Sequence, residues 1–427
     1  MKIVIINNSD SLGGAAIVSR RLMYALRAVG VDAKMLVMNC RESYPEGEVQ
    51  EYGRNLHGKY CFLAERLEIF THNRFDRSKL FKVDTAHFGF DLSEHPWVKE
   101  ADVINLNWIN QGAMSLTAIE HLCQLGKPVL WTMHDTWCAT GICHHPLSCR
   151  RYLDNDCGKC ALLNSGSEHD LSWKVFQQKK RLFYKYPNLH LVAVSSWMAG
   201  IASHSPLTAH CDISVIGNAF PIGEFACHKI DSADLHDSDK VGIAFGAARL
   251  DDSIKGFDTL IRLTRHIATH HPQLAKRLHL TLFGSIRNPQ LLQNIAIPYS
   301  HLGPLGMESV KKVYRQSDII LSTSHFETLS GTVIEGMASG CIPITGSDGG
   351  FADIFTHLEE GYRAKPQDIE DITAGLLWAC SLLDQSRANP TEAESLREQL
   401  HHSVASRFDQ HNIALQYISL CDKVLSK

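Results

Sequence analysis

The chain has 427 residues, of which 44% are hydrophobic and 21% are charged, a composition typical of a globular protein. Because single hydrophobic cores seldom grow beyond about 250–300 residues, this length favours two domains of roughly 200 residues each. The 42 Lys and Arg against 46 Asp and Glu give a formal net charge of −4, which disfavours a nucleic-acid-binding protein.

The chain begins MKIVIINNSD, and this short apolar run is too small for the core of a signal peptide. No uninterrupted apolar stretch reaches the roughly 18 residues of a membrane span. The 13 cysteines, without an export signal, indicate a reducing compartment in which thiols stay free or bind metal. We therefore expect a cytoplasmic protein.

The first half of the chain alternates short apolar runs with helical patterns. Ile3–Ile6 is a continuous apolar run, typical of a parallel strand that is buried on both faces. After a Gly-Gly pair, a helical pattern extends to Val29 and ends at Gly30. Further strands are expected at residues 35–38, 102–106, 129–133 and 191–194. This alternation predicts a doubly wound α/β domain over residues 1–220.

The same pattern restarts after a polar, turn-rich segment at residues 221–240, which is interpreted as a linker. Strands are expected at residues 241–246, 278–283, 318–321 and 341–344, and helices at residues 256–270, 307–316, 331–339 and 367–383. They predict a second α/β domain over residues 241–410, and a last helix at residues 411–427 is expected to pack back on the first. The predicted fold class is α/β, with two Rossmann-like domains that face each other across a ligand-binding cleft.

The most specific motif lies at residues 322–345, STSHFETLSGTVIEGMASGCIPIT. Glu327 and Glu335 are separated by seven residues and follow a predicted strand. Taken alone, they could equally be two solvated glutamates. With a helix that begins here, both carboxylates lie near the cleft. The unpaired amides at the helix start, which can bind a phosphate, are those of Ser330, Gly331 and Thr332.

The Glu-x7-Glu spacing, followed by Gly-Met-Ala-Ser-Gly-x-x-Pro, resembles the signature of the retaining GT-B glycosyltransferases of family four, also called glycosyltransferase group 1. The resemblance implies that Glu335 binds the ribose hydroxyls of a nucleotide and that Glu327 holds hydroxyls of the donor sugar. The surrounding Gly and Pro residues favour this interpretation over two solvated side chains.

Arg249 and Lys255 form a second motif in the segment FGAARLDDSIKGFDTLI. They lie between a predicted buried strand and a predicted helix, where two cations can straddle one diphosphate. In the family, the matching Arg and Lys bind the donor diphosphate and stabilise it as the leaving group. The alternative is a solvated basic pair beside Asp251 and Asp252.

Two further matches follow strands of the first domain. Gly13 and Gly14 allow the backbone to approach a ligand, and the next helix offers its positive end. Alone, a Gly-Gly turn is usually only a tight connection, but this one resembles the family's first loop, which faces the donor phosphate and the acceptor. His134 follows the strand at residues 129–133. A lone His is more often structural, whereas the matching His of relatives contacts the donor sugar.

Residues 138–160, CATGICHHPLSCRRYLDNDCGKC, hold five cysteines and two histidines. Cys157 and Cys160 have the spacing of a metal knuckle, and Cys143 and Cys149 could complete four thiolates for a structural zinc. A long loop without periodicity needs something to hold it, which favours zinc; a redox pair and free thiols are the alternatives. A similar loop occurs in relatives that build colanic acid, capsule or O-antigen chains.

A basic aromatic segment, WKVFQQKKRLFYKY, occupies residues 173–186. It could lie on anionic lipid, and the alternative is an amphipathic helix packed on the first sheet. Since the acceptor of such enzymes is often lipid-linked, peripheral contact with the inner face of the membrane stays open.

Together the motifs predict an enzyme that moves a hexosyl group from a nucleoside diphosphate sugar to a hydroxyl of a glycan or lipid-linked glycan. Retention of configuration and a role in bacterial surface polysaccharide biosynthesis are implied by the resemblance. No catalytic metal is expected, because fixed cations and the helix start would stabilise the leaving diphosphate. The alternatives are a nucleotide-sugar epimerase and a catalytically silent sugar-nucleotide-binding protein. The expected catalytic residues are His134, Arg249, Lys255 and Glu327.

Overall fold

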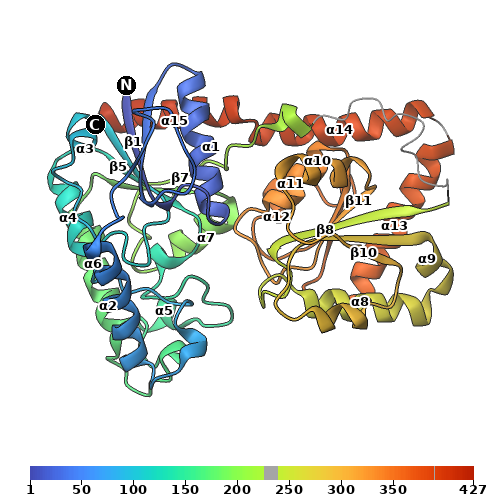
Figure 1. Ribbon diagram of the computed structural model, residues 1–427, viewed down its shortest axis with the longest axis horizontal. Coiled ribbons are helices and arrows are strands. Elements are labelled where there is room, and N and C mark those ends of the chain that lie inside the picture. The colour runs from blue at the N-terminus through green and yellow to red at the C-terminus, as the bar shows by residue number, and fades with distance from the viewer. Residues whose placement is uncertain (226–238, 389) are drawn as a thin grey trace. The chain divides into compact units, whose positions relative to one another are not determined.

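The computed structural model describes residues 1–225, 239–388 and 390–427, which form two compact units (Figure 1). The first unit comprises residues 1–219 and 410–427, and the second comprises residues 220–409. Residues 226–238 of the expected linker lie outside the described residues.

The first unit is built on a seven-stranded parallel sheet in the order β3-β2-β1-β4-β5-β6-β7. At the centre of the sheet, Ile3 of β1 pairs with Ala33 of β2 on one side and with Val103 of β4 on the other. The strand order reverses between β1 and β4, as in a Rossmann fold. The strands are β1 (Lys2–Ser9), β2 (Asp32–Asn39), β3 (Val49–Glu51), β4 (Val103–Leu106), β5 (Val129–Met133), β6 (Leu189–Ala193) and β7 (Ile213–Val215).

Helices cover both faces of this sheet. On one face α1 packs against α15, and on the other α4 packs against α6. The helices are α1 (Gly14–Ala28), α2 (Leu56–His72), α3 (Pro96–Glu100), α4 (Leu116–Gln124), α5 (Arg151–Asp154), α6 (Leu171–Lys185), α7 (Ser196–His204) and α15 (Gln410–Leu425), with the 3-10 turns η1 (Arg77–Lys79), η2 (Trp137–Ala139) and η3 (Ala161–Leu163).

The first strand shows why a continuous apolar run is needed. Ile3 and Ile5 enter the core that α1 and α15 cover, whereas Val4 and Ile6 enter the core beneath α4 and α6. Because successive side chains of a strand point to opposite faces, a strand between two cores must be apolar at every position. The strand predicted at Ile3–Ile6 is confirmed.

The second unit repeats the plan with a six-stranded parallel sheet in the order β10-β9-β8-β11-β12-β13. The order reverses between β8 and β11. The strands are β8 (Val241–Arg249), β9 (Leu278–Ser285), β10 (Tyr299–His301), β11 (Ile319–Ser322), β12 (Ile342–Gly346) and β13 (Tyr362–Ala364). A register shift between Gly246 and Arg249 extends β8 beyond the expected strand.

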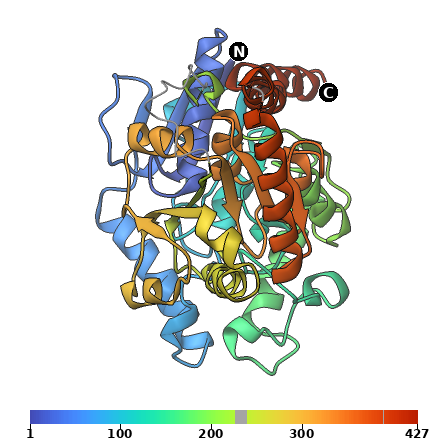
Figure 2. The same cartoon turned by 90° about the vertical axis from the view of Figure 1, so that its right-hand side faces the viewer.

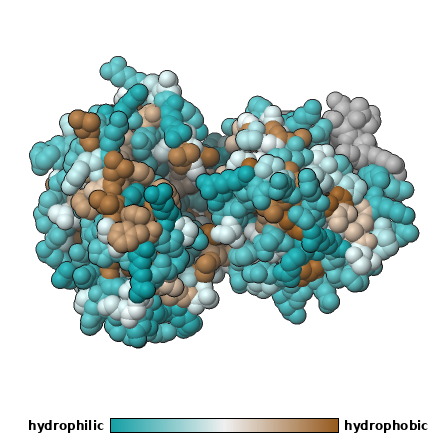
Figure 3. Space-filling view, turned by 60° about the horizontal axis from the view of Figure 1, so that its bottom comes forward, coloured by the Kyte–Doolittle hydropathy of each residue, from teal (hydrophilic) through white to brown (hydrophobic). Residues whose placement is uncertain are grey.

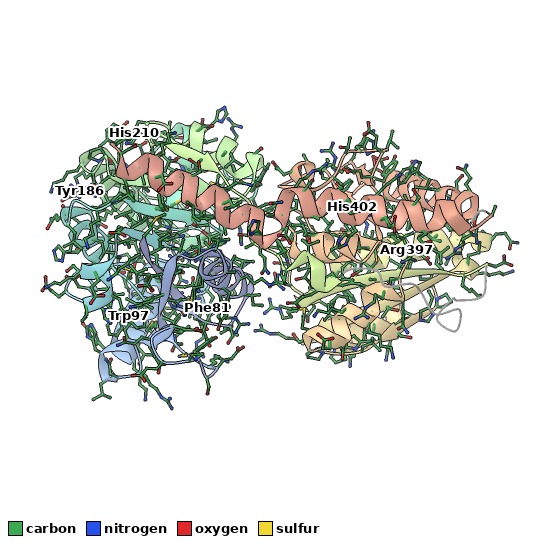
Figure 4. All side chains as sticks on the ribbon, turned by 90° about the horizontal axis from the view of Figure 1, so that it is seen from above. Phe81, Trp97, Tyr186, His210, Arg397 and His402 are labelled. Carbon is green, nitrogen blue, oxygen red and sulfur yellow. The ribbon has the colours of Figure 1, made fainter. Side chains whose placement is uncertain are left out.

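Figure 2 turns the second unit toward the viewer and shows its sheet flanked by helices. α8 packs with α9 and α13, and α11 packs with α14 and η4. Arg397, labelled in Figure 4 on α14, contacts Asp318 at the start of β11. The elements are η4 (Ile222–Phe225), α8 (Phe257–His270), α9 (Pro272–Arg277), η5 (Pro289–Asn294), α10 (Met307–Arg315), α11 (Gly331–Ala338), α12 (Phe351–Ile354), α13 (Ile369–Ala388) and α14 (Pro390–Phe408).

The predicted fold class and the predicted central strands of both sheets are confirmed. The edge strands β3, β7, β10 and β13 were not predicted, because three residues carry too little pattern to distinguish a strand from a loop. None of the helices in the described residues combines the length and the hydropathy that a membrane crossing requires.

Candidate functional site

Two loops of the second unit are joined at the carboxyl edge of its sheet, one after β8 and one after β11. The amide of His325 donates to the carbonyl of Ile254 at 2.8 Å, and the Thr323 hydroxyl donates to the carbonyl of Gly256 at 2.7 Å. Gly256 has a φ of +67°, and a Cβ there would lie 1.9 Å from the carbonyl oxygen of Thr323. Only glycine therefore permits this close approach.

Glu327 lies where the loop after β12 meets these two. Its carboxylate accepts hydrogen bonds from Lys255 Nζ at 2.6 Å and from the Ser324 hydroxyl at 2.8 Å. Its carbonyl accepts from the amide of Gly350 at 2.7 Å. Gly349, with a φ of +97°, passes so close that a Cβ would meet the carbonyl oxygen of Glu327 at 2.2 Å. Three loops thus hold Glu327 beside Lys255.

The two expected phosphate-binding cations have different partners. Arg249 donates to Asp252 at 2.5 Å and lies 3.7 Å from Asp251. Burial alone would lower the pKa of Lys255, but the charge of Glu327 and its hydrogen bond outweigh burial and raise that pKa. Lys255 is therefore a cation held against Glu327 rather than a solvated neighbour of the two aspartates.

The N-terminus of α11 carries no side-chain cap. The helix begins at Gly331, the residue at which a helix start was predicted, and Ser330 is its N-cap residue without a capping hydrogen bond. The Ser330 and Thr332 hydroxyls lie 3.2 Å apart. Amides of an uncapped first turn are available to an anion. Glu335 lies in the next turn of the same helix and is largely buried.

The Gly-Gly pair of the first unit lies at a second uncapped helix start. Gly13 is the N-cap residue of α1 and has a φ of +90°, and no side chain caps that helix. A Cβ at Gly13 or at Gly14 would meet no atom within 4 Å. Gly13 is therefore favoured by its positive φ, whereas at Gly14 there is room for a side chain in this structure.

His134 directly follows β5 and is oriented by a neighbouring strand end. Its Nε2 lies 2.7 Å from Oδ1 of Asn107, which follows β4. Because an amide oxygen only accepts, Nε2 carries the proton and Nδ1 is the acceptor of the ring. Burial lowers the pKa of His134 to about 4, so the imidazole is neutral at physiological pH.

A buried charge network continues from the next residue. Asp135 accepts from the indole of Trp108 at 3.0 Å and pairs with Nδ1 of His144 at 2.7 Å. Nε2 of His144 pairs with Asp84 at 2.5 Å, and Asp84 also binds Arg66. Burial alone would raise the pKa of Asp135, but the charge and hydrogen bond of His144 lower it to about 2.

Sequence reasoning missed Asn107 and His144. Asn107 carried a usable signal, because it is a polar residue that directly follows a buried strand of a parallel sheet. His144 carried none beyond its place in the cysteine-rich segment, since its partners lie nine and sixty residues away.

The four cysteines expected to bind zinc do not assemble into a metal site. Cys157 is buried in the first unit's core, Cys143 and Cys160 are partly buried against it, and Cys149 is exposed. Across residues 1–225, 239–388 and 390–427, no group of three or more His, Cys, Asp or Glu side chains is arranged to hold a metal ion. The expected structural zinc is therefore not supported by this geometry.

Other contacts hold the cysteine-rich loop. The fully buried Lys179 of α6 donates to the carbonyls of Trp137 at 2.6 Å and Thr140 at 3.1 Å. Burial lowers its pKa to about 7. Arg151 donates to the carbonyl of Gly158 at 2.6 Å. These contacts hold the loop through its carbonyls, and zinc binding by the four cysteines stays a prediction.

The basic aromatic segment at residues 173–186 is α6 and the residue after it. Its buried side chains include Val175, Phe176, Leu182 and Phe183, which belong to the core beneath the sheet. The structure thus shows the second alternative, an amphipathic helix packed on the first sheet.

Comparison with known families and proteins identifies one matching family model and one curated relative that matches part of the chain. The family model of "Glycosyl transferases group 1" matches residues 231–395, which include Arg249, Lys255, Glu327 and Glu335. The chain is 30% identical over 127 residues to a 2-deoxystreptamine N-acetyl-D-glucosaminyltransferase of Niallia circulans. That match covers 30% of this chain and about a third of the relative, 31% of its length.

Solved structures resemble the whole chain. A sucrose-phosphate synthase from Thermosynechococcus elongatus has a TM-score of 0.66 at 15% identity and covers 100% of this chain and 99% of its own. HepE of Anabaena, in complex with UDP and glucose, has a TM-score of 0.61 at 15% identity, with 99% of each chain covered. At such identities the likeness shows the fold alone, which is the GT-B fold of two Rossmann-like domains.

Proposed function

Because residues 231–395 match the family model of the group 1 glycosyl transferases, we propose that this chain transfers a hexosyl group from a nucleoside diphosphate sugar to a glycan hydroxyl. The observation that carries the proposal is the Lys255–Glu327 pair, held at 2.6 Å beside the uncapped start of α11. A cation, a carboxylate and free helix amides are the groups that a sugar diphosphate needs.

The second unit is proposed to bind the donor. Lys255, Arg249 and the first amides of α11 would bind the diphosphate, and Glu335 would accept hydrogen bonds from the ribose hydroxyls. Lys255 would exchange Glu327 for a phosphate oxygen when the donor binds. Glu327 would then be free to accept hydrogen bonds from hydroxyls of the donor sugar.

The first unit is proposed to bind the acceptor, and His134 to contact the donor sugar. Asn107 orients the ring of His134, and burial keeps the imidazole neutral. A neutral imidazole can accept a sugar hydroxyl's hydrogen bond without competing with Lys255 and Arg249 for the diphosphate.

Transfer with retention is proposed to need no covalent intermediate. As the bond from the sugar to the diphosphate breaks, the leaving group gains negative charge, which Lys255, Arg249 and the α11 amides stabilise. The departing phosphate oxygen takes the proton of the acceptor hydroxyl while that hydroxyl attacks from the same face. Cations fixed by the fold supply the stabilisation that a divalent metal supplies in other enzymes.

The names of the relatives suggest which donors to test first. The HepE structure holds UDP and glucose, and the Niallia circulans relative is named for transfer of N-acetylglucosamine. We propose a UDP-hexose or UDP-N-acetylhexosamine as the donor class, and a glycan of the bacterial surface, free or lipid-linked, as the acceptor.

The test is a screen of nucleotide sugars by thermal shift and by release of nucleoside diphosphate. A transferase releases the diphosphate from one donor and forms a product whose new anomeric centre has the donor's configuration by NMR. An epimerase would instead yield the epimeric sugar, and a silent binding protein would bind the donor without releasing diphosphate. Either result would overturn the proposal.

A further inference from the structure

The outer face of α2 carries an apolar stripe that is exposed among the described residues. Leu56, Tyr60, Leu63 and Leu67 are 84%, 59%, 63% and 62% exposed. Their spacing of four, three and four residues places them on one side of the helix at about 100° per residue. The residues that α2 buries, among them Cys61 and Ile69, lie on the opposite side.

Two exposed phenylalanines widen the stripe into a patch. Phe81, labelled in Figure 4, is 59% exposed and stacks on Phe62 of α2, with ring centroids 6.4 Å apart. Phe75, 65% exposed, contacts Phe70 of α2 edge to face at 5.2 Å. The α2 patch is defined as Leu56, Tyr60, Leu63, Leu67, Phe75 and Phe81. Figure 3 shows hydrophobic residues gathered on the first unit among hydrophilic ones.

The exposed charges around the α2 patch are basic, whereas Asp76, beside Phe75, is partly exposed and lies 3.8 Å from Lys79. Within residues 54–82 every exposed charged side chain is basic, although the whole chain has a net charge of −4. None of these cations forms a salt bridge with another described residue. They are Arg54, Lys59, Arg74, Arg77 and Lys82.

The two glutamates of α2 are turned toward the protein. Glu65 is fully buried and accepts from the amides of Thr85 and Ala86. Glu68 pairs with His87 at 2.7 Å. α2 therefore directs Glu65 and Glu68 toward the protein and its apolar stripe and Lys59 to the outside, whereas Arg66 is buried against Asp84.

We propose that the α2 patch docks the first unit on a membrane surface rich in anionic lipid. Leucine and aromatic side chains can enter the interface while a surrounding set of Lys and Arg binds lipid phosphates. A second copy of the chain fits less well, because a two-fold dimer would bring the same five cations against each other. The patch is distinct from the α6 segment, whose apolar side chains are buried.

The inference rests on the proposed function in one respect, since a lipid-linked acceptor would give the contact its purpose. The contact itself is independent of transfer, and binding to vesicles is therefore measured without donor or acceptor. Failure of vesicle binding and failure of glycosyl transfer are separate outcomes.

The full chain is sedimented with vesicles of phosphatidylcholine alone or mixed with phosphatidylglycerol. We expect binding only to the anionic vesicles, weakened by added salt because the attraction is screened. The triple variant Leu56→Ser, Leu63→Ser, Leu67→Ser should lower the partition coefficient by about tenfold or more. The matched control replaces three exposed leucines elsewhere, namely Leu377, Leu415 and Leu425, by serine and should bind like the parent.

The charge contribution is measured with Arg74→Gln, Arg77→Gln, Lys82→Gln, for which a loss of about tenfold or more is also expected. Its matched control neutralises three exposed cations far from α2 in the sequence, Arg262, Lys312 and Lys423. Equal losses in the patch variants and their controls would overturn the proposal, as would binding of the parent to neutral vesicles with equal strength.

A further measurement uses only the unsubstituted protein, so its result does not depend on whether a variant folds. Anionic vesicles should slow tryptic cleavage after Lys59, Arg74 and Lys82 and leave cleavage after Arg262 unchanged. Unslowed cleavage, or a dimer in sedimentation equilibrium that the leucine variant abolishes, would contradict a lipid partner. The dimer result would assign the patch to a second copy of the chain.

Discussion

At the scale of single residues, the proposed donor site contains side chains that form an ion pair with each other. Lys255 and Glu327 are 72 residues apart in the sequence and 2.6 Å apart in the fold. An ion pair that is 33% and 16% exposed is weaker than a phosphate contact made by the same Lys with helix amides beside it. We therefore expect the pair to keep the two groups in place until a donor displaces Glu327 from Lys255.

Substitutions of Glu335 and Glu327 are expected to affect different steps, nucleotide binding and donor turnover. Glu335→Ala should weaken binding of free UDP by about 1.5–3 kcal/mol, because the ribose hydroxyls lose a charged partner. Glu327→Ala should lower donor turnover more than affinity for UDP. Calorimetry with UDP and initial rates with the donor separate the two effects, and Glu370→Ala, an exposed acid of α13, is the control. If both variants bind UDP as the parent does, the motif is misassigned.

Lys255→Ala and Arg249→Ala should each reduce turnover by roughly two to three decades, the range seen when one transition-state stabiliser is lost. Arg262→Ala, on the exposed face of α8, should leave the rate unchanged. Activity should also survive EDTA, because cations of the protein meet the leaving diphosphate. Strict dependence on added Mg²⁺ or Mn²⁺ with a nearly active Lys255→Ala enzyme would contradict this mechanism.

At the scale of elements, hydrogen bonds and close backbone contacts join the loops that follow neighbouring strands in each of the two sheets. In the second unit the contact is between the backbone of Gly256 and that of Thr323. In the first unit a network of hydrogen bonds and ion pairs links Trp108 to Asp84 through Asp135 and His144. Loops joined in this way hold site residues more rigidly than loops that are free at the surface.

Gly256→Ala should lower stability by about 2–4 kcal/mol and weaken donor binding, because both the positive φ and the contact with Thr323 oppose a Cβ. Gly303→Ala is a matched control. Gly303 has a φ of +69°, but a Cβ there would meet no atom within 4 Å. Chemical denaturation of the two variants separates backbone strain from the loop contact, and equal losses would show that the contact contributes nothing.

Asp135 should make the first unit acid-sensitive. Its folded pKa of about 2 lies below the ordinary value of 3.8, so its stabilising effect is present above pH 4 and is lost as pH falls toward 2. Asp135→Asn should cost about 2 kcal/mol at pH 5. The difference from the parent should shrink on acidification, as measured by urea denaturation across this range. A difference that stays constant with pH would refute the linkage.

At the scale of the whole molecule, the end of the chain completes the domain in which it began. α15 contributes Ile413, Tyr417 and Leu420 to the core that β1 and α1 share. The Tyr417 hydroxyl lies 3.1 Å from that of Thr132 in β5. The first unit is therefore complete only after the second has been synthesised.

Tyr417→Ala should destabilise the first unit by about 3–5 kcal/mol, the usual cost of removing a buried aromatic side chain. Leu415→Ala, exposed on the same helix, should change stability by less than about 0.5 kcal/mol. Hydrogen exchange followed by mass spectrometry should show lost protection in β1, β4 and β5 but not in β8 and β11. Equal loss in both sheets would mean that the two units unfold as one.

The sequence by itself determined the elements whose pattern is local. Continuous apolar runs such as Ile3–Ile6 predicted the buried strands, and the Gly and Glu spacing around Gly331 predicted both the start of α11 and the family. Only the tertiary structure decided which side chains meet across long separations. It paired Lys255 with Glu327, placed Lys179 beneath the cysteine-rich loop, and left one face of α2 exposed while covering the apolar face of α6. Helical spacing marks an apolar face, but what covers that face depends on chain segments far away in the sequence.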